Sequence, residues 1–262
     1  MSMFRRNQPD PAAPPPAPTG LGAAISLEKV QQTAPALVSL YKQAGVSLEK
    51  RGLTGQRSAV YLVLDRSGSM APYYRERRGQ ISHMQYFAEQ TLGLSANLDD
   101  DGVVPLVFFD SQSFPVVEIS LTDYQGRIGA EHDRLGRMGG TDYASAMRTV
   151  VDHYQESGAS TPAFVVFQTD GATYNENTVK DLLRDYSHLP IFWQFVGFGP
   201  AGSREFAFLR TLDKLRGRAV DNAGFFEAGT DPAALSDAAL YDQLMDEYPT
   251  WLAAARAKGI LR

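Results

Sequence analysis

Cysteine is absent from this sequence of 262 residues. Without it the chain can form no disulfide bond, no thiolate zinc site and no cysteine nucleophile. A run of about 20 apolar residues, which a helix needs to span a bilayer, is absent as well. Residues 1–10 include two arginines but no apolar stretch after them, so they do not resemble a secretory signal. These absences predict a cytoplasmic protein that is not associated with a membrane.

Basic residues are slightly outnumbered, with 25 Lys and Arg against 30 Asp and Glu and a formal net charge of −5. A protein that binds the phosphates of nucleic acid needs a basic surface, so we expect no nucleic-acid partner. Apolar residues make up 44% of the chain, which is enough to build a core. The composition therefore predicts a globular protein.

Three segments of different composition divide the chain. Residues 1–23 are rich in proline and alanine, and we expect them to form a disordered, partly extended tail. Residues 24–54 show a helical pattern broken at Pro35, which predicts an N-terminal helical arm packed on the domain. Residues 55–262 alternate strand and helix patterns and should form the domain itself.

Continuous apolar segments in this domain are typical of strands buried in a parallel sheet. They are residues 59–64, 103–109, 163–168 and 191–196. A further strand at 114–119 follows so closely that we expect an antiparallel hairpin, and Pro105 indicates an edge or a bulge. Helices are expected near residues 81–92, 143–154, 177–186, 205–215 and 236–248. The alternation predicts an α/β fold: a doubly wound, mostly parallel sheet with helices on both faces and one antiparallel edge strand.

Oxygen-bearing side chains stand in three loops that can reach the carboxyl edge of this sheet, where such folds bind ligands. They are Asp65, Ser67 and Ser69 after the first strand, Thr141 before a helix, and Asp170 after the strand at 163–168. Two carboxylates and three hydroxyls, with no imidazole or thiol, suit a hard divalent ion, Mg²⁺ first and Mn²⁺ or Ca²⁺ as alternatives. The two carboxylates would neutralise that ion, and an open coordination position could accept a carboxylate from outside.

The order and context of these five residues resemble the metal-ion-dependent adhesion site of von Willebrand factor A domains. The resemblance implies that the two serines and the threonine ligate the metal directly. It implies that the two aspartates often act through water, and that an Asp or Glu of a protein partner completes the shell. Arg66 departs from the apolar residue common there, and could add positive potential beside the metal or point to solvent. Tyr73 and Tyr74 could belong to the binding rim or to the packing.

Other segments resemble one bacterial group of these proteins, associated with tellurium resistance and general chemical stress. They are residues 98–102, 164–171, 191–199, 221–226 and 248–251, and the likeness spans residues 25–262. The resemblance implies a setting among calcium-binding stress proteins and other cytoplasmic components.

Three other functions are alternatives to a binding module. A metal-dependent hydrolase or phosphoryl-transfer enzyme could use the same ion, but nothing in the sequence orients Asp142 or Glu176 as a base. Residues 197–202 fit a dinucleotide-binding pattern, yet Pro200 interrupts it and it follows the fifth main strand instead of the first. A scaffold that works through another surface is the third possibility. We therefore expect a module that binds a partner's carboxylate through its metal and has no catalytic residues.

Overall fold

A six-stranded sheet runs through the centre of the computed structural model, which describes residues 22–76, 79–212 and 214–261. The strand order is β3-β2-β1-β4-β5-β6. The strands are β1 (Ala59–Asp65), β2 (Val103–Phe109), β3 (Val117–Ser120), β4 (Ala163–Thr169), β5 (Ile191–Phe198) and β6 (Ala223–Gly229). Every neighbouring pair is parallel except β2 and β3, so the predicted doubly wound sheet with an antiparallel edge strand is confirmed.

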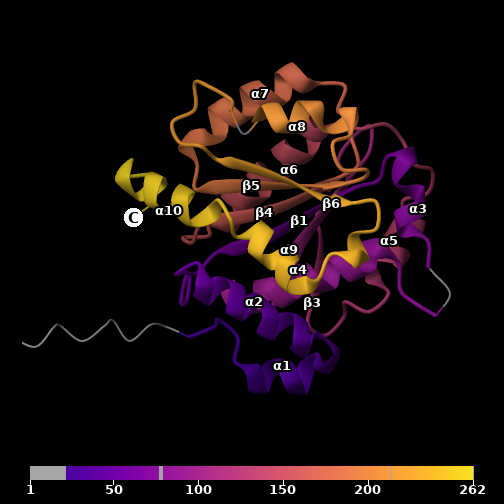
Figure 1. The fold of residues 1–262 in the computed structure, drawn as a ribbon, viewed down its shortest axis with the longest axis vertical. Coiled ribbons are helices and arrows are strands. Elements are labelled where there is room, and N and C mark those ends of the chain that lie inside the picture. The colour runs from indigo at the N-terminus through magenta and orange to yellow at the C-terminus, as the bar shows by residue number, and fades with distance from the viewer. Residues whose placement is uncertain (1–21, 77–78, 213, 262) are drawn as a thin grey trace, which may run out of the picture.

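Helices cover both faces of this sheet (Figure 1). One face carries α6 (Tyr143–Ser157), α7 (Glu176–Asp185) and α8 (Ala207–Leu212). The other carries α1 (Leu27–Thr33), α2 (Val38–Lys50), α4 (His83–Leu98), α5 (Arg127–Arg134), α9 (Asp237–Leu244) and α10 (Tyr248–Ala257). The short helix α3 (Ala71–Tyr74) lies beyond the end of β1. Short 3-10 turns complete the chain at Pro35–Leu37, Gly68–Met70, Tyr186–His188, Arg204–Phe206 and Pro232–Ala234. Within the described ranges no helix is both long and apolar enough to cross a membrane.

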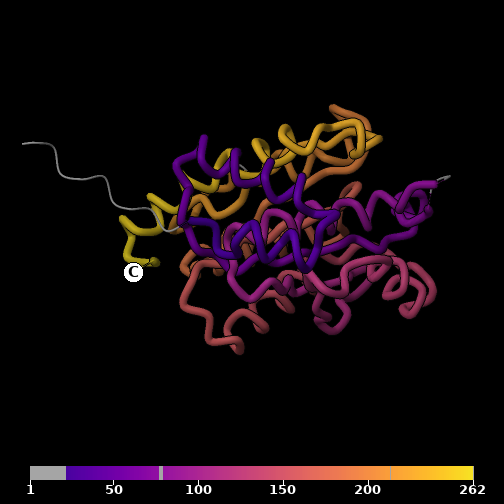
Figure 2. The backbone as a smooth tube through the Cα atoms, turned by 90° about the horizontal axis from the view of Figure 1, so that it is seen from below, coloured from indigo at the N-terminus to yellow at the C-terminus, as the bar shows by residue number. Residues whose placement is uncertain are grey.

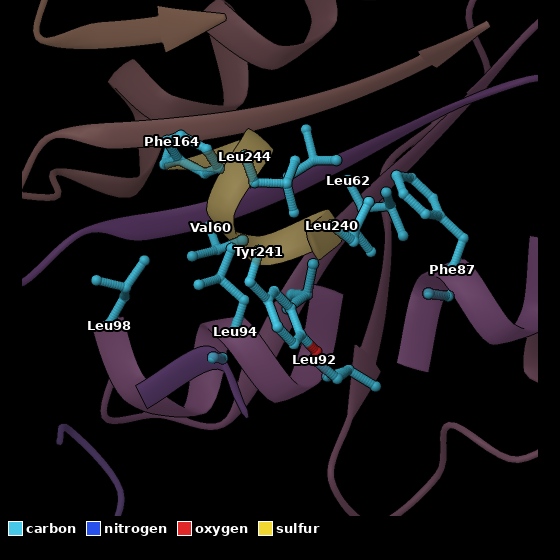
Figure 3. Close-up of a cluster of buried hydrophobic side chains, with 14 of the residues drawn as sticks. Val60, Leu62, Phe87, Leu92, Leu94, Leu98, Phe164, Leu240, Tyr241 and Leu244 are labelled. Carbon is cyan, nitrogen blue, oxygen red and sulfur yellow. The ribbon is translucent and has the colours of Figure 1, made fainter. Parts of the chain in front are cut away.

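The alternation of side chains along each strand divides the core into two clusters. In β1, Val60 and Leu62 pack with α4 and α9 on one face, as Figure 3 shows. Their neighbours Tyr61 and Val63 pack on the other face, in the cluster that α6 helps to form. Both faces are therefore buried, which is why the sequence of β1 is apolar at nearly every position.

The N-terminal helices α1 and α2 share the core of the sheet. Val30 and Leu40 belong to the same buried cluster as Leu62. The close contact with α4 depends on Gly93, where an added Cβ would stand 2.8 Å from the Cβ of Leu40. Seen from below, these indigo helices cross the face of the molecule with the yellow C-terminal segment beside them (Figure 2). Of the predicted tail, residues 1–21 lie outside the described residues.

Some predicted element boundaries were wrong. The strand at 114–119 begins later, at Val117. The helix predicted from Ile81 begins at His83, because the Ser82 hydroxyl caps it by accepting from the backbone N–H of Gln85 (3.1 Å), and Ile81 is 41% exposed. The prediction missed α5 and the strand β6, whose sequence AGFFEAG has glycines where a buried strand usually has branched residues.

The interpretation of Pro105 as an edge or bulge signal was also wrong. This residue lies in β2, between β1 and β3, and pairs in register with Glu118. The pairing of β2 with β1 begins only at Leu106. Pro105 therefore precedes the part of β2 that pairs with β1, and its missing N–H costs that ladder no hydrogen bond.

Candidate metal site at the carboxyl edge of the sheet

The predicted ligands lie where the direction of the strand order reverses. The chain leaves β1 for β2 on one side and later returns to β4 on the other, so the carboxyl ends of β1 and β4 form the switch point at which such folds bind ligands. Asp65 is the last residue of β1, and Asp170 directly follows β4. The sheet thus places carboxylates of two distant segments at one edge.

Hydrogen bonds bring four of the five predicted residues together. The Ser67 and Ser69 hydroxyl oxygens are 3.1 Å apart, and the Ser69 hydroxyl donates to Oδ1 of Asp170 (3.0 Å). The backbone N–H of Ser67 donates to Oδ1 of Asp65 (2.6 Å). The loop after β1 therefore curls so that Asp65, Ser67 and Ser69 face Asp170.

Thr141 is held at the same edge by its backbone. The N–H of Gly68 donates to the carbonyl of Gly139 (3.0 Å), which ties the loop of Thr141 to the loop after β1. The Thr141 carbonyl accepts from the Thr173 hydroxyl (2.9 Å). No described residue hydrogen-bonds to the Thr141 hydroxyl, which leaves that oxygen available to a ligand.

Asp65 is held by Thr169, which the sequence analysis did not assign to the site, and by Tyr74. The Thr169 hydroxyl donates to Oδ2 of Asp65 (2.7 Å) and accepts from the Tyr143 hydroxyl (2.8 Å). The Tyr74 hydroxyl donates to the backbone carbonyl of Asp65 (2.8 Å). Tyr74 is buried, so of its two interpretations packing is confirmed. The sequence signal that could have identified Thr169 was its position directly before Asp170, at the carboxyl end of β4.

Burial sets the electrostatics of the two carboxylates. Asp65 is 0% exposed, and burial raises its pKa to about 7, against the Thr169 hydrogen bond and with a further contribution from Asp170. Burial also raises the pKa of Asp170, against the Ser69 hydrogen bond, and the charge of Glu205 adds to the shift. In the described part of the chain no Lys, Arg or His forms an ion pair with either aspartate. Two such carboxylates favour a bound cation.

Arg66 does not point to solvent, so that alternative is wrong. Its guanidinium is fully buried and pairs with Asp110 at 3.0 Å (Nη1 to Oδ2). It also donates to the carbonyl of Gly136 and, through Nε, to Nδ1 of His132 (3.3 Å). Burial and the neighbouring Arg66 charge lower the pKa of His132, whose ring stacks on Tyr74. Arg66 thus joins the loop after β1 to the loop that leads to Thr141.

The side chains considered as bases have structural partners. The Asp142 carboxylate caps α6 by accepting from the N–H of Ser145 (3.0 Å), and it also accepts from the Asn175 amide. Glu176 forms an ion pair with Lys180 (3.9 Å). These contacts give both carboxylates a structural role in the loops and helices around the site.

The glycine-rich segment at residues 197–202, which begins inside β5, serves packing. A Cβ added at Gly197 would stand 2.9 Å from the ring of Phe206, and one at Gly199 would stand 3.1 Å from it. Gly202, at a φ of 73°, donates its N–H to Oε2 of Glu227 (2.7 Å). These contacts account for the glycines without a dinucleotide.

Comparison with known proteins gives the family. The model of the von Willebrand factor A domain found in the C terminus of TerF matches residues 57–261, and the chain belongs to this TerF-like vWA family. The curated protein YcbR of Bacillus subtilis (strain 168), which is described as uncharacterized, is 36% identical over 225 residues. That alignment covers 84% of this chain and 88% of YcbR.

Solved structures with a similar fold share little sequence with the chain. Proximal thread matrix protein 1 of the mussel byssus is 14% identical, with a TM-score of 0.49, over 74% of this chain and 48% of that one. The chain thus spans about half the length of the mussel protein. The manganese-loaded TRAP protein of Plasmodium vivax is 14% identical, with a TM-score of 0.47, over 72% of this chain and 74% of that one.

Proposed function

We propose that this chain is a protein-binding module that uses a divalent metal, Mg²⁺ first, to coordinate a carboxylate of its partner. The ligands would be Asp65, Ser67, Ser69, Thr141 and Asp170. The observation that supports this proposal is the meeting of these oxygen-bearing residues at one sheet edge, with the two carboxylates unpaired by any described cationic side chain. The metal would supply the missing positive charge and hold the partner's carboxylate at its open position.

The donor set fits a hard cation of this kind. Two carboxylates neutralise a divalent ion, and the hydroxyls add neutral oxygen ligands that Mg²⁺ and Mn²⁺ accept. No group of three or more His, Cys, Asp or Glu side chains among the described residues is placed to hold a metal. The hydroxyl-rich edge of the sheet is therefore the site that we propose.

The chain's family and its sequence resemblance suggest a setting. The likeness to the bacterial group associated with tellurium resistance and chemical stress, together with membership of the TerF-like family, supports a role in such a system in the cytoplasm. The partner would then be another component of that stress response. We propose a binding role in preference to a hydrolase or phosphoryl-transfer activity, because the contacts of Asp142 and Glu176 explain their positions without a substrate.

Metal binding is tested first on the purified chain. Mn²⁺ titration should give one site, and Mg²⁺ at about 100 times its dissociation constant should raise the free energy of unfolding by about 2.7 kcal/mol. Asp170→Ala should lose both effects, whereas Asp152→Ala, which removes an exposed aspartate of α6, should keep them. Equal metal binding by both variants would contradict the proposed ligands.

Partner capture then tests the function. Lysate proteins should be retained by the wild-type chain in Mg²⁺, and lost in EDTA or with Asp170→Ala. An Asp or Glu substitution in the retained partner should have the same effect. Retention that is equal in all three conditions would remove the metal from the mechanism and favour a scaffold that works through another surface. Metal-dependent hydrolysis of a phosphate monoester, abolished by Asp170→Ala, would favour the enzymatic alternative.

A further inference from the structure

A pocket opens directly beside the proposed metal site. Its volume is about 340 Å³, and its lining includes Ser69 and Asp170 from the metal site itself. The other lining residues that matter here are Tyr73, His83, Phe198 and Glu205. A partner segment whose carboxylate reached the metal would therefore place its neighbouring side chains over this pocket.

Aromatic rings form one wall of the pocket. Tyr73 packs against Phe198, with 5.4 Å between ring centroids, and meets the ring of His83 edge-on at 5.7 Å. Tyr73 is only partly buried, so its ring is accessible from the pocket. An exposed aromatic ring attracts a cation placed over its face.

The lining of the pocket also carries negative charge. Glu205 is exposed and leans over Gly171, where an added Cβ would stand 3.6 Å from Oε2 of Glu205. Its carboxylate has no hydrogen bond or ion pair with any described residue, and no Lys or Arg belongs to the described lining of the pocket. The pocket is thus acidic and aromatic, and its one histidine, His83, is paired with Asp231 (2.9 Å) and not with Glu205.

We infer that this pocket receives a Lys or Arg side chain from the same partner segment that supplies the metal-bound carboxylate. The cation would lie between the Tyr73 ring and the Glu205 carboxylate. Because Ser69 and Asp170 border both sites, the basic residue would stand one or two positions from the partner's Asp or Glu. The inference deepens the proposed function, on which it rests, by giving the partner a paired acidic and basic recognition motif.

A phage-displayed library of random seven-residue peptides tests this motif. Selection uses the wild-type chain in Mg²⁺, after removal of peptides that bind Asp170→Ala in the same buffer. Selected peptides should contain Asp or Glu with Lys or Arg one or two positions away. The basic residue should be enriched roughly 3- to 10-fold over Gln at the same position, the range expected for an exposed ion pair with a cation–π contact.

Charge variants of Glu205 make the test specific. Glu205→Gln should still select acidic residues but lose the preference for a basic neighbour, and Glu205→Lys should favour an acidic neighbour instead. Glu118→Lys makes the same change of charge at an exposed position of β3, at the opposite edge of the sheet from β6, and should select the wild-type motif.

The outcomes separate this inference from the proposed function. Metal-dependent selection of Asp or Glu with no basic neighbour, or with an apolar one, would overturn the inference and leave the proposed function standing. Selection with no dependence on metal or on an acidic residue would contradict the proposed function itself. Loss of Mn²⁺ binding by Glu205→Gln would also overturn the inference, because it would make Glu205 part of the metal site.

Discussion

The two sides of the proposed metal site differ in how their charges are compensated. On the closed side, which we define by Arg66, Asp110 and His132, the charged groups are mostly buried and each has a partner within the chain. On the open side, defined by Tyr73, Asp170 and Glu205, the carboxylates have no cationic partner among the described residues, and the side chains line a pocket. The two sides are neighbours in the sheet: Arg66 and Asp110 follow β1 and β2, and Asp170 follows β4, which pairs with β1.

The closed side therefore holds the loops in place, and the open side is the one available to a partner. The buried Arg66–Asp110 pair ties together three loops, and such a pair tolerates little movement because either charge alone would be costly. Uncompensated charge on the open side can instead be satisfied by groups from outside. We therefore expect changes on the closed side to affect folding, and changes on the open side to affect binding.

The largest effect should come from breaking the buried ion pair. Arg66→Met leaves the Asp110 carboxylate buried without a partner, and we expect the free energy of unfolding to fall by about 3–5 kcal/mol. Urea denaturation in EDTA measures this loss without a metal contribution. The double variant Arg66→Met with Asp110→Asn should lose less, because no isolated charge remains. A loss below about 1 kcal/mol for the single variant would show that the closed side is not rigidly held.

The two sides can also be compared by making the same substitution, Gly to Ala, at one glycine near each side and measuring the loss of stability. A Cβ at Gly139, near the closed side, would stand 2.7 Å from the Ser111 hydroxyl and 2.9 Å from Cγ of Asp110. One at Gly171 would meet only Glu205, at 3.5 Å or more. Gly139→Ala should therefore cost about 1–3 kcal/mol of stability and weaken Mn²⁺ binding through Thr141, while Gly171→Ala stays within about 0.5 kcal/mol. Equal losses of unfolding free energy in the two variants, measured by urea denaturation, would show that the closed side is no more tightly packed than the open side.

The sequence was enough to predict five of the six strands and the position of the proposed ligand residues at one edge of the sheet, for physical reasons that particular residues show. A strand buried on both faces, such as β1, is apolar throughout, and the residue after it must lie at the carboxyl edge. The direction of Arg66 could not be predicted, because its partner Asp110 comes 44 residues later and meets it only through strand register. The position of Glu205 over Gly171 depends on loop conformation, which no sequence periodicity records.

The pH dependence of folding gives a smaller test of the closed side. Burial and Arg66 hold the pKa of His132 below its value in the unfolded chain, so the unfolded state binds more protons as the pH falls through about 6.5. The wild-type chain in EDTA should lose more stability between pH 7.5 and pH 5.5 than His132→Gln does, as urea denaturation at each pH would measure. The exposed His188→Gln serves as the control and should keep the wild-type difference. If His132→Gln lost as much stability as wild type between the two pH values, protonation of His132 would not disturb the buried contacts of Arg66.

The smallest effect on folding is expected at Tyr174, the one large exposed aromatic residue of the described chain. It is 67% exposed beside Gly140, and its hydroxyl donates to the carbonyl of Ser111 (3.1 Å), so it lies on the outer surface next to the closed side. Tyr174→Ala should change the free energy of unfolding by less than about 0.5 kcal/mol, as urea denaturation would measure.

Partner binding should respond to Tyr174 differently from folding, because exposed aromatic residues at the centre of an interface often dominate its affinity. In the capture experiment in Mg²⁺, Tyr174→Ala should retain less partner than wild type, while Tyr174→Phe, which keeps the ring and loses the hydroxyl, should retain most of it. Destabilisation by more than about 1 kcal/mol in Tyr174→Ala would place this residue in the rigid framework of the closed side. Unchanged capture by a stable Tyr174→Ala would instead confine the partner's contacts to the metal and the open side.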